Sequence, residues 1–244
     1  EPLEIRVTGE TVAVTMRTPG ADHELVVGFL HAEGLIAKAG DLGRVFHCGK
    51  PNDEGFGNVM DVTPAPGTSI DLERLGAARR GTLTTAACGV CGRQSVDDLL
   101  ASCRPVEVTT RFAAGAVAKF QGLLGERQRV FRETGGTHAA ALVTRDGELL
   151  FLREDVGRHN AVDKIVGRLL LDGLDASRFA LVVSGRSSFE IVQKAARASL
   201  PLVVGVSAPT SLAIDAARRT CVTLVGFARG AAFNVYSVAD RIVF

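Results

Sequence analysis

The segment Phe179-Ala180-Leu181-Val182-Val183-Ser184-Gly185-Arg186-Ser187-Ser188 places an apolar run of strand length directly before small polar residues. An apolar run bounded by Ser and Gly is typical of a buried strand that turns into a helix. The same order returns in a predicted strand at 202–207 and helix at 211–219. Alternating strands and helices predict a largely parallel sheet that helices cover on both faces.

Residues 109–244, on either side of this segment, share its regular pattern. We expect a long amphipathic helix, a hairpin with its turn at Asp146-Gly147, three helix–strand units and a closing strand. The predicted helices are 111–131, 160–171, 188–198 and 211–219, and the predicted strands are 139–144, 148–152, 179–183, 202–207, 222–227 and 234–238. This order resembles the cytidine-deaminase-like fold, so we predict a three-layer α/β/α domain with a mixed sheet.

Residues 1–108 have a different pattern and predict a smaller, strand-rich α+β domain. Leu3–Val7 and Val12–Met16 alternate apolar and polar residues around Gly9-Glu10, which indicates a hairpin. Asp22–Ile36 has helical spacing of its apolar residues, with Asp22 placed as the N-cap. Two short strands are expected at 44–47 and 58–62, and the domain should end in a cysteine-bearing loop and a short helix.

Composition excludes several classes of protein. Of the 244 residues, 46% are hydrophobic and 23% charged, which is typical of a folded protein. Lys and Arg number 28 against 27 acids, so no bulk positive field favours nucleic acid or an anionic membrane. Arg outnumbers Lys by 23 to 5, which fits either coding bias or recognition of phosphate and carboxylate groups.

The sequence also indicates where the protein works. No apolar stretch approaches the roughly 20 residues of a membrane span. The first residues, Glu1 to Glu4, lack the basic and apolar regions of a signal peptide. An odd number of cysteines, five, suits a reducing compartment. We therefore expect a cytoplasmic protein.

The strongest chemical feature is the pair of thiols in Cys88-Gly89-Val90-Cys91-Gly92-Arg93. Two cysteines at this spacing can form a disulfide, supply half of a zinc site, or act as nucleophile and helper; they can also be merely buried. A helix start is predicted at Ser95, so a helix N-terminus and Arg93 would favour a thiolate here. A loop that presents an activated thiolate suits handing a group between proteins.

Zinc is the weaker interpretation, because a zinc site takes four ligands. His47-Cys48 is the nearest further combination, and its two ligands would be adjacent in sequence. Cys103 and Cys221 stand alone and are expected to be structural. Zinc deaminases place their ligands at positions that here hold the segments 153–160 and 184–188, where His159 is the single candidate ligand. We therefore expect no metal site.

The turns after three predicted strands form the second candidate site. The carboxyl ends of parallel strands meet at one edge of a sheet, where helix N-termini offer backbone amides to ligands. The turns at 184–188, 205–210 and 226–230 follow such strands. Each is explained equally by ordinary helix capping, but together, with Arg158 and Arg186 nearby, they favour a phosphate-bearing ligand.

The histidines leave two interpretations open. His159 lies between Arg158 and Asn160 and is either a hydrogen-bonding residue at a helix start or a proton-transfer or ligand contact. His138 enters a predicted strand and could serve in either way. His23 and His31 fall on the first predicted helix and are expected to be structural or exposed.

Several of these motifs, taken together, resemble the formate dehydrogenase accessory sulfurtransferase family, usually called FdhD. The resemblance covers nearly the whole chain, and its most specific part is the block Glu154 to Lys164. The other matching segments are Cys88-Gly89-Val90-Cys91-Gly92, Gly136-Thr137-His138-Ala139-Ala140, Ser184-Gly185-Arg186-Ser187-Ser188 and Leu224-Val225-Gly226-Phe227.

The resemblance implies a sulfurtransferase. It would accept persulfide sulfur from a cysteine desulfurase on Cys88, assisted by Cys91, and pass it to a molybdenum or tungsten bis-molybdopterin guanine dinucleotide destined for formate dehydrogenase. It also implies a homodimer. The implied cofactor-binding segment is Phe227, Ala228, Arg229, Gly230, Ala231 and Ala232, and our strand-end prediction adds Arg158, His159, Ser184, Gly185, Arg186 and Ser187. Ala231-Ala232 departs from the basic residue often found there, which leaves that contact open.

Two other functions compete with this one. A non-catalytic chaperone could bind the cofactor and dock apo formate dehydrogenase with purely structural cysteines. A zinc-dependent nucleotide hydrolase is disfavoured by the missing ligands. Gain of one sulfur atom on Cys88 separates the sulfurtransferase from the chaperone.

Overall fold

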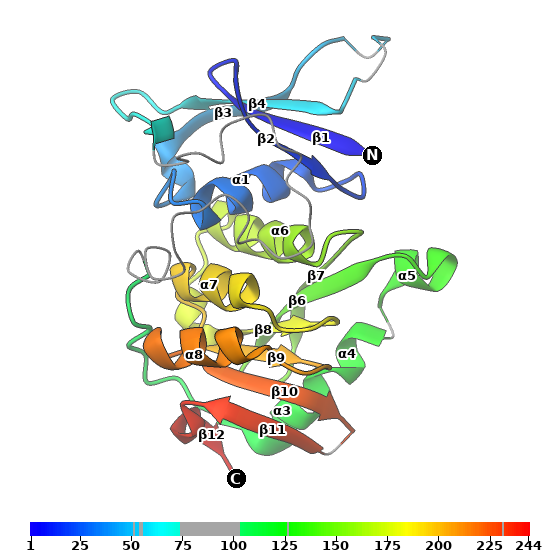
Figure 1. The fold of residues 1–244 in the computed structure, drawn as a ribbon, viewed down its shortest axis with the longest axis vertical. Coiled ribbons are helices and arrows are strands. Elements are labelled where there is room, and N and C mark those ends of the chain that lie inside the picture. The colour runs from blue at the N-terminus through cyan, green and yellow to red at the C-terminus, as the bar shows by residue number, and fades with distance from the viewer. Residues whose placement is uncertain (51, 54–55, 74–102, 126, 231) are drawn as a thin grey trace.

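The computed structural model describes residues 1–244 except 51, 54–55, 74–102, 126 and 231. A smaller sheet lies at one end of the long axis, and the C-terminus lies at the other end (Figure 1). A larger sheet with its helices fills the space between them (Figure 1). The predicted loop with Cys88 and Cys91, and the helix after it, lie outside the described residues.

The smaller sheet begins with the predicted hairpin, β1 (Pro2–Val7) and β2 (Glu10–Met16), which is confirmed. β4 (Val59–Pro64) pairs parallel with β1, and β3 (Leu42–His47) pairs antiparallel with β4. The order is β2-β1-β4-β3. Both short strands expected in this region are therefore present.

Helix α1 (Asp22–Ala32) packs the inner face of the smaller sheet and differs from prediction at both ends. The cap predicted at Asp22 is wrong: the N-cap is Ala21, and no side chain caps the helix. The Asp22 carboxylate instead accepts hydrogen bonds from Arg17 at 3.2 Å. The helix ends before Ile36 because the chain reverses at Gly34, which has a φ of +79°.

α1 crosses α6 (Arg158–Leu171) at backbone contact distance. A Cβ added to Gly28 would lie 1.9 Å from the carbonyl oxygen of Asp163, and one added to Gly167 would lie 1.8 Å from that of Glu24. Figure 1 shows α1 between the smaller sheet and α6. These two glycines thus allow the close contact of α1 with α6, which joins the first part of the chain to the second.

The larger sheet has the order β11-β10-β9-β8-β6-β7. Its central strands β8, β9 and β10 are parallel, whereas β6, β7 and β11 pair antiparallel with their neighbours. The sheet is therefore mixed, with a parallel centre and a hairpin at each edge. The strands are β6 (His138–Thr144), β7 (Leu149–Asp155), β8 (Phe179–Val183), β9 (Leu202–Gly205), β10 (Thr223–Arg229) and β11 (Ala232–Ser237).

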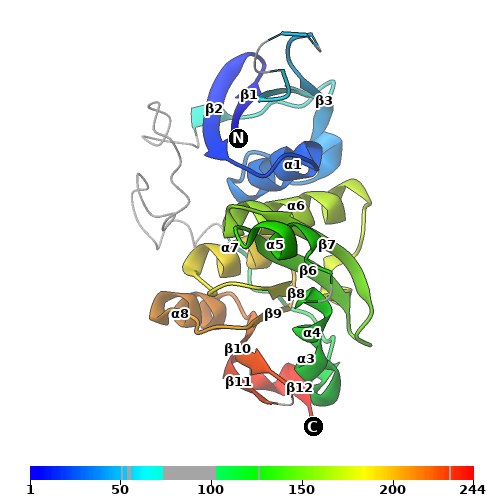
Figure 2. The same cartoon turned by 90° about the vertical axis from the view of Figure 1, so that its right-hand side faces the viewer.

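Helices cover both faces of the larger sheet, as Figure 2 shows from the side. α6, α7 (Phe189–Arg197) and α8 (Ser211–Arg219) share one apolar core with it. α3 (Ala114–Phe120) and α4 (Gly122–Gly125) share another. The mixed α/β class is confirmed, while the cytidine-deaminase-like arrangement and a domain boundary after residue 108 stay predictions.

The long helix predicted at 111–131 is wrong. The chain there forms β5 (Phe112–Ala113), α3, α4 and α5 (Arg129–Thr134) in succession. β5 pairs with β12 (Ile242–Val243), which draws the first residues out of helical geometry. Glycines at 115, 122 and 125 destabilise the remaining part of the predicted helix, because glycine disfavours a helix by about 1 kcal/mol relative to alanine. Short 3₁₀ turns complete the described chain at η1 (Ala39–Asp41), η3 (Ala176–Arg178) and η4 (Ala239–Arg241).

Within the described ranges, every helix is too short or too polar to cross a membrane.

His31 at the end of α1 is buried against α7, which confirms a structural place for it. Burial, with Arg197 and Lys194 nearby, lowers its pKa from 6.5 to about 4. The unfolded chain therefore binds more protons between these values, so stability falls as the pH drops through this window.

We expect the free energy of unfolding to fall by about 2 kcal/mol from His31 alone between pH 7 and pH 5. His31→Gln, which does not titrate, should lose this part of the pH dependence. Urea unfolding of both proteins at the two pH values measures it. Equal pH dependence in the two proteins would contradict the assignment.

Candidate functional site

The predicted turns after β8, β9 and β10 lie side by side at one edge of the larger sheet. Ser187 forms a parallel bridge with Pro209, and the amide of Thr210 donates to the Ser187 carbonyl at 3.1 Å. The amide of Phe227 donates to the carbonyl of Ser207 at 3.3 Å. The structure therefore gathers these three turns into one surface, as the topology required.

Ser187 is the buried centre of this surface. Its hydroxyl has no hydrogen-bond partner within the described part of the chain. A Cβ at Gly205 would lie 2.6 Å from that hydroxyl oxygen, so any side chain at this position would displace the hydroxyl. Ser184 is already engaged, because its hydroxyl accepts from the amide of Ala139 at 2.8 Å. The serines of this turn thus differ in what they can offer a ligand.

A cavity of about 430 Å³ opens beside these turns, between the ends of the central strands and the α4–α5 segment. Its wall combines backbone amides, two side-chain amides, an imidazole and an aromatic ring. Burial, reinforced by Arg158 and His159, lowers the pKa of His138, so its imidazole is neutral near pH 7. The lining residues are Gln121, Leu124, Gly125, Gln128, Phe131, Gly135, Gly136, Thr137, His138, Ser184 and Val206.

Glu154 shapes that cavity. Its carboxylate accepts hydrogen bonds from the amides of Val130 and Phe131, at 2.9 and 2.7 Å, and from the hydroxyl of Thr137 at 3.0 Å. These bonds fix the start of α5 and the entry to β6. Glu154, a residue of the specific block at 154–164, therefore holds the wall of the cavity in place, although it does not itself line the cavity.

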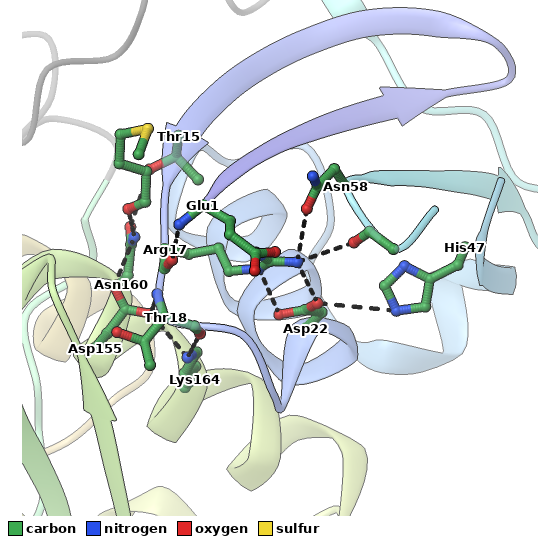
Figure 3. A network of polar contacts seen from close by, with 12 residues as sticks. Glu1, Thr15, Arg17, Thr18, Asp22, His47, Asn58, Asp155, Asn160 and Lys164 are labelled. Atoms are coloured by element: carbon green, nitrogen blue, oxygen red, sulfur yellow. Dashed lines mark hydrogen bonds and ion pairs between the residues drawn. The ribbon is translucent and has the colours of Figure 1, made fainter. Parts of the chain in front are cut away.

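Other members of that block tie the first part of the chain to the second (Figure 3). Asp155 and Lys164 form a fully buried ion pair at 2.7 Å. The Lys164 ammonium also donates to the Thr18 carbonyl at 2.8 Å, and Asp155 accepts from the Thr18 amide at 3.1 Å. Asn160 donates to the carbonyl of Met16 at 2.8 Å. These residues anchor the segment between β2 and α1.

His159 and Arg158, both predicted at the ligand edge, have different surroundings. The buried His159 contacts Ser188, the N-cap of α7, and Glu190 within α7 through its two ring nitrogens. Its hydrogen-bonding interpretation is therefore confirmed, and ligand contact stays a prediction. Arg158 lies against the turn, with its Cδ 3.9 Å from a Cβ placed on Gly185. Arg186 is exposed on the same turn.

The predicted segment 227–232 is an irregular strand end. The pairing of β10 with β11 shifts register between Gly226 and Arg229, and Phe227 takes a φ of +53°, which is strained for an aromatic residue. This bend leaves the Phe227 side chain 44% exposed, while that of Ala228 is fully buried. Ala228 can therefore offer a ligand its backbone alone. Arg229, Gly230 and Ala232 are exposed, and Ala231 lies outside the described residues.

The cysteines that the structure describes do not form a chemical centre with one another. Cys103 is buried, as expected of a structural thiol, whereas Cys48 and Cys221 are half-buried. Within the described ranges, no cluster of three His, Cys, Asp or Glu side chains could hold a metal ion. Cys88 and Cys91 are not among these residues, so the expectation of no metal site stays a prediction.

Comparison with known proteins agrees with the family resemblance of the sequence motifs. The family model described as "FdhD/NarQ family" matches residues 1–243. The chain belongs to the FdhD/NarQ family. The resemblance on the motifs at 88–92, 136–140, 154–164 and 184–188 is thereby confirmed.

Curated relatives within the FdhD/NarQ family are similar along almost the whole chain. A protein of Anaeromyxobacter dehalogenans (strain 2CP-1) named "Sulfur carrier protein FdhD" is 53% identical over 249 residues, which cover 99% of this chain and 86% of that protein. One of the same name from Streptomyces coelicolor is 49% identical over 252 residues, covering 99% and 87%. One from Mycobacterium tuberculosis is 45% identical over 260 residues, covering 99% and 90%.

A solved structure supports the fold. The crystal structure of a protein from Desulfotalea psychrophila, described as a formate dehydrogenase accessory protein, superposes with a TM-score of 0.76 at 24% identity. The match covers 100% of this chain and 89% of that one. The FdhD/NarQ chain described here therefore has the same overall fold.

Sequence reasoning missed the residues that build the cavity from outside the turns. Gln121, Gln128 and Phe131 were assigned to a continuous helix, whose break creates the wall they form. Glu190 was missed because its contact with His159 depends on how α7 packs on α6. The acceptor role of Glu154 had one signal, its place in the family block.

Proposed function

We propose that this chain is a sulfur carrier for the maturation of formate dehydrogenase, acting as a sulfurtransferase. The observation that most directly supports this is similarity at about half of all positions to proteins named "Sulfur carrier protein FdhD", together with the thiol pair Cys88 and Cys91. A cysteine desulfurase supplies the sulfur, and the catalytic subunit of formate dehydrogenase receives the product. The proposal places the protein in the cytoplasm as a homodimer.

Cys88 performs the chemistry in this proposal. Its thiolate attacks the outer sulfur of the donor persulfide, the donor sulfur–sulfur bond breaks, and the donor cysteine leaves as a thiolate. Cys88 then holds the sulfur as a persulfide and returns to a thiolate when the outer sulfur passes to the substrate. Cys91 assists by lowering the pKa of Cys88 or by resolving a stalled intermediate.

The substrate is a bis-molybdopterin guanine dinucleotide of molybdenum or tungsten, whose nucleotide arms bind at the edge of the larger sheet. The 430 Å³ cavity offers the guanine base the neutral imidazole of His138 and the side-chain amides of Gln121 and Gln128. The exposed Phe227 ring and the Arg229 guanidinium offer a stacking face and a phosphate contact. In this proposal the surface is the crevice of a cytidine-deaminase-like fold used without its metal.

Mass spectrometry tests the sulfur step. After incubation with a cysteine desulfurase and cysteine, the peptide that contains Cys88 should gain one sulfur atom, and a reducing agent should remove it. The Cys48 peptide of the same sample is the internal control, because that thiol is half-buried and has no place in the proposal. An unchanged Cys88 peptide would favour the non-catalytic chaperone.

Guanosine diphosphate tests the substrate surface. A ligand that binds the folded state alone stabilises it by about 2.7 kcal/mol at a concentration of one hundred times Kd. We expect a thermal shift with this nucleotide that Phe227→Ala reduces and Phe56→Ala, at an exposed ring on the smaller sheet side, leaves intact. No shift in the parent protein, with no heat of binding by calorimetry, would contradict the surface.

A further inference from the structure

Three side chains beside the proposed substrate surface have the arrangement of a nucleophile, a base and an orienting acid. His159 of α6 lies between Ser188 and Glu190, which flank the first residue of α7. Its Nε2 is 3.1 Å from the Ser188 hydroxyl oxygen, and its Nδ1 is 2.7 Å from Glu190 Oε2. Neither Ser188 nor Glu190 lines the cavity or has a part in the sulfur step.

The acid of this relay sets its polarity through its charge. The Glu190 carboxylate, 2.7 Å from Nδ1, favours the tautomer of His159 that has its proton on that nitrogen. Nε2 is then an acceptor, and the Ser188 hydroxyl donates to it. Burial lowers the pKa of His159, although Glu190 opposes this, so the ring is neutral and basic near pH 7.

Ser188 lies at the start of a helix, where backbone amides can stabilise the negative charge that its attack on a substrate would produce. It is the N-cap of α7, yet its side chain does not cap the helix, because the hydroxyl faces His159 instead. The first backbone amides of a helix have no acceptor within the helix. They point out of its N-terminus, which carries a partial positive charge. Amides in this position are suited to stabilise an oxyanion that forms next to Ser188. Ser188 is half-buried.

We propose that Ser188, His159 and Glu190 form an acyl-transfer site for small anionic carboxylic esters, distinct from sulfur transfer. The anionic preference follows from the exposed Arg186, two residues before Ser188, and from Arg158 against the same turn. The proposal uses none of the cysteines, so it stands or falls independently of the sulfur carrier.

The reaction balances without an added cofactor. The Ser188 oxygen attacks the ester carbon while its proton moves to His159 Nε2, and the carbonyl electrons move to the oxygen facing the α7 amides. Collapse expels the alcohol oxygen, which takes the proton from Nε2 and leaves an acyl-serine. Water then attacks the acyl group by the same path, releasing the acid and restoring Ser188.

A fluorophosphonate probe tests the nucleophile, because its phosphorus accepts a base-activated serine and releases fluoride. We expect a phosphonyl adduct on the Ser188 peptide, formed at least tenfold more slowly in His159→Ala and in Glu190→Gln. Ser177→Ala, at a half-buried serine of η3 outside this site, is the matched control and should label Ser188 at the parent rate. Release of p-nitrophenolate from the monoester of succinic acid, taken as the difference between the parent and Ser188→Ala, reports turnover.

The pH dependence separates catalysis from a structural role. Labelling should be lost as the pH falls through the pKa of His159, because the protonated ring cannot accept the serine proton. The groups that face this ring are Glu190 and Lys194 of α7, Arg158 of α6 and His138 of β6. Glu190→Gln preserves size and guards against a variant that fails to fold. Absence of the adduct in the folded parent, or labelling of the His159→Ala and Glu190→Gln variants at the parent rate, would overturn the proposal.

Discussion

A Cys88→Ala variant is expected to fold as the parent does and to leave formate dehydrogenase without measurable activity. Alanine has no sulfur to attack the donor persulfide and none to hold the transferred atom, so the relay has no intermediate. Loss should exceed about 100-fold, because removing the attacking atom abolishes a covalent route altogether. The measurement is formate dehydrogenase activity after co-expression in cells that lack their own sulfur carrier.

Cys48→Ala provides the comparison for this result. It removes a half-buried thiol from the described part of the chain, and we expect maturation close to the parent level. Thermal unfolding of all three proteins shows whether activity differs at equal stability. Full maturation by a folded Cys88→Ala protein would exclude a persulfide on Cys88 and return the cysteines to a structural role.

Gly167→Ala is expected to have the largest effect on stability. The added Cβ would lie 1.8 Å from the Glu24 carbonyl oxygen and 2.9 Å from the amide nitrogen of Gly28, and both are backbone atoms of α1. α1 and α6 would have to separate, which disturbs the core of the smaller sheet and the polar network around Asp155. Overpacking of this kind costs about 3 kcal/mol or more. Such a loss lowers Tm by roughly 10 °C in a protein of this size.

Gly115→Ala is the matched control for the α1–α6 contact. Gly115 lies within α3, and a Cβ there would have no atom within 4 Å. Alanine favours a helix over glycine by about 1 kcal/mol, so this variant should be unchanged or slightly more stable. The same substitution should thus have opposite signs at the two positions. A Gly167→Ala protein as stable as the parent would show that the helices are not in backbone contact.

The sequence predicted much of the fold because its local patterns agree with the tertiary structure. The hairpin around Gly9-Glu10, the buried strand at 179–183 and the helix–strand alternation after it are all present. These elements depend on turn residues and on period, which are local properties. The helix predicted at 111–131 was wrong because pairing of β5 with β12 joins residues that lie far apart in the chain.

The candidate site was predictable to a lesser degree. Strand topology alone brings together the turns at 184–188, 205–210 and 226–230, and the family motifs identified Cys88 and Cys91. The shape of the cavity was not predictable, since its wall depends on Glu154 binding the start of α5. The relay through His159 depends on the packing of α7 against α6, which no local pattern encodes.

By itself the sequence determined the class of the fold, the family and the cysteines of the proposed chemistry, because these follow from period and from motif. The tertiary structure alone decided what the block 154–164 does. Asp155, Asn160 and Lys164 bind backbone groups of residues 16–18, more than 130 positions away in the chain. Such buried polar groups acquire their partners only when the chain has folded, since desolvation makes each bond depend on the whole surrounding core.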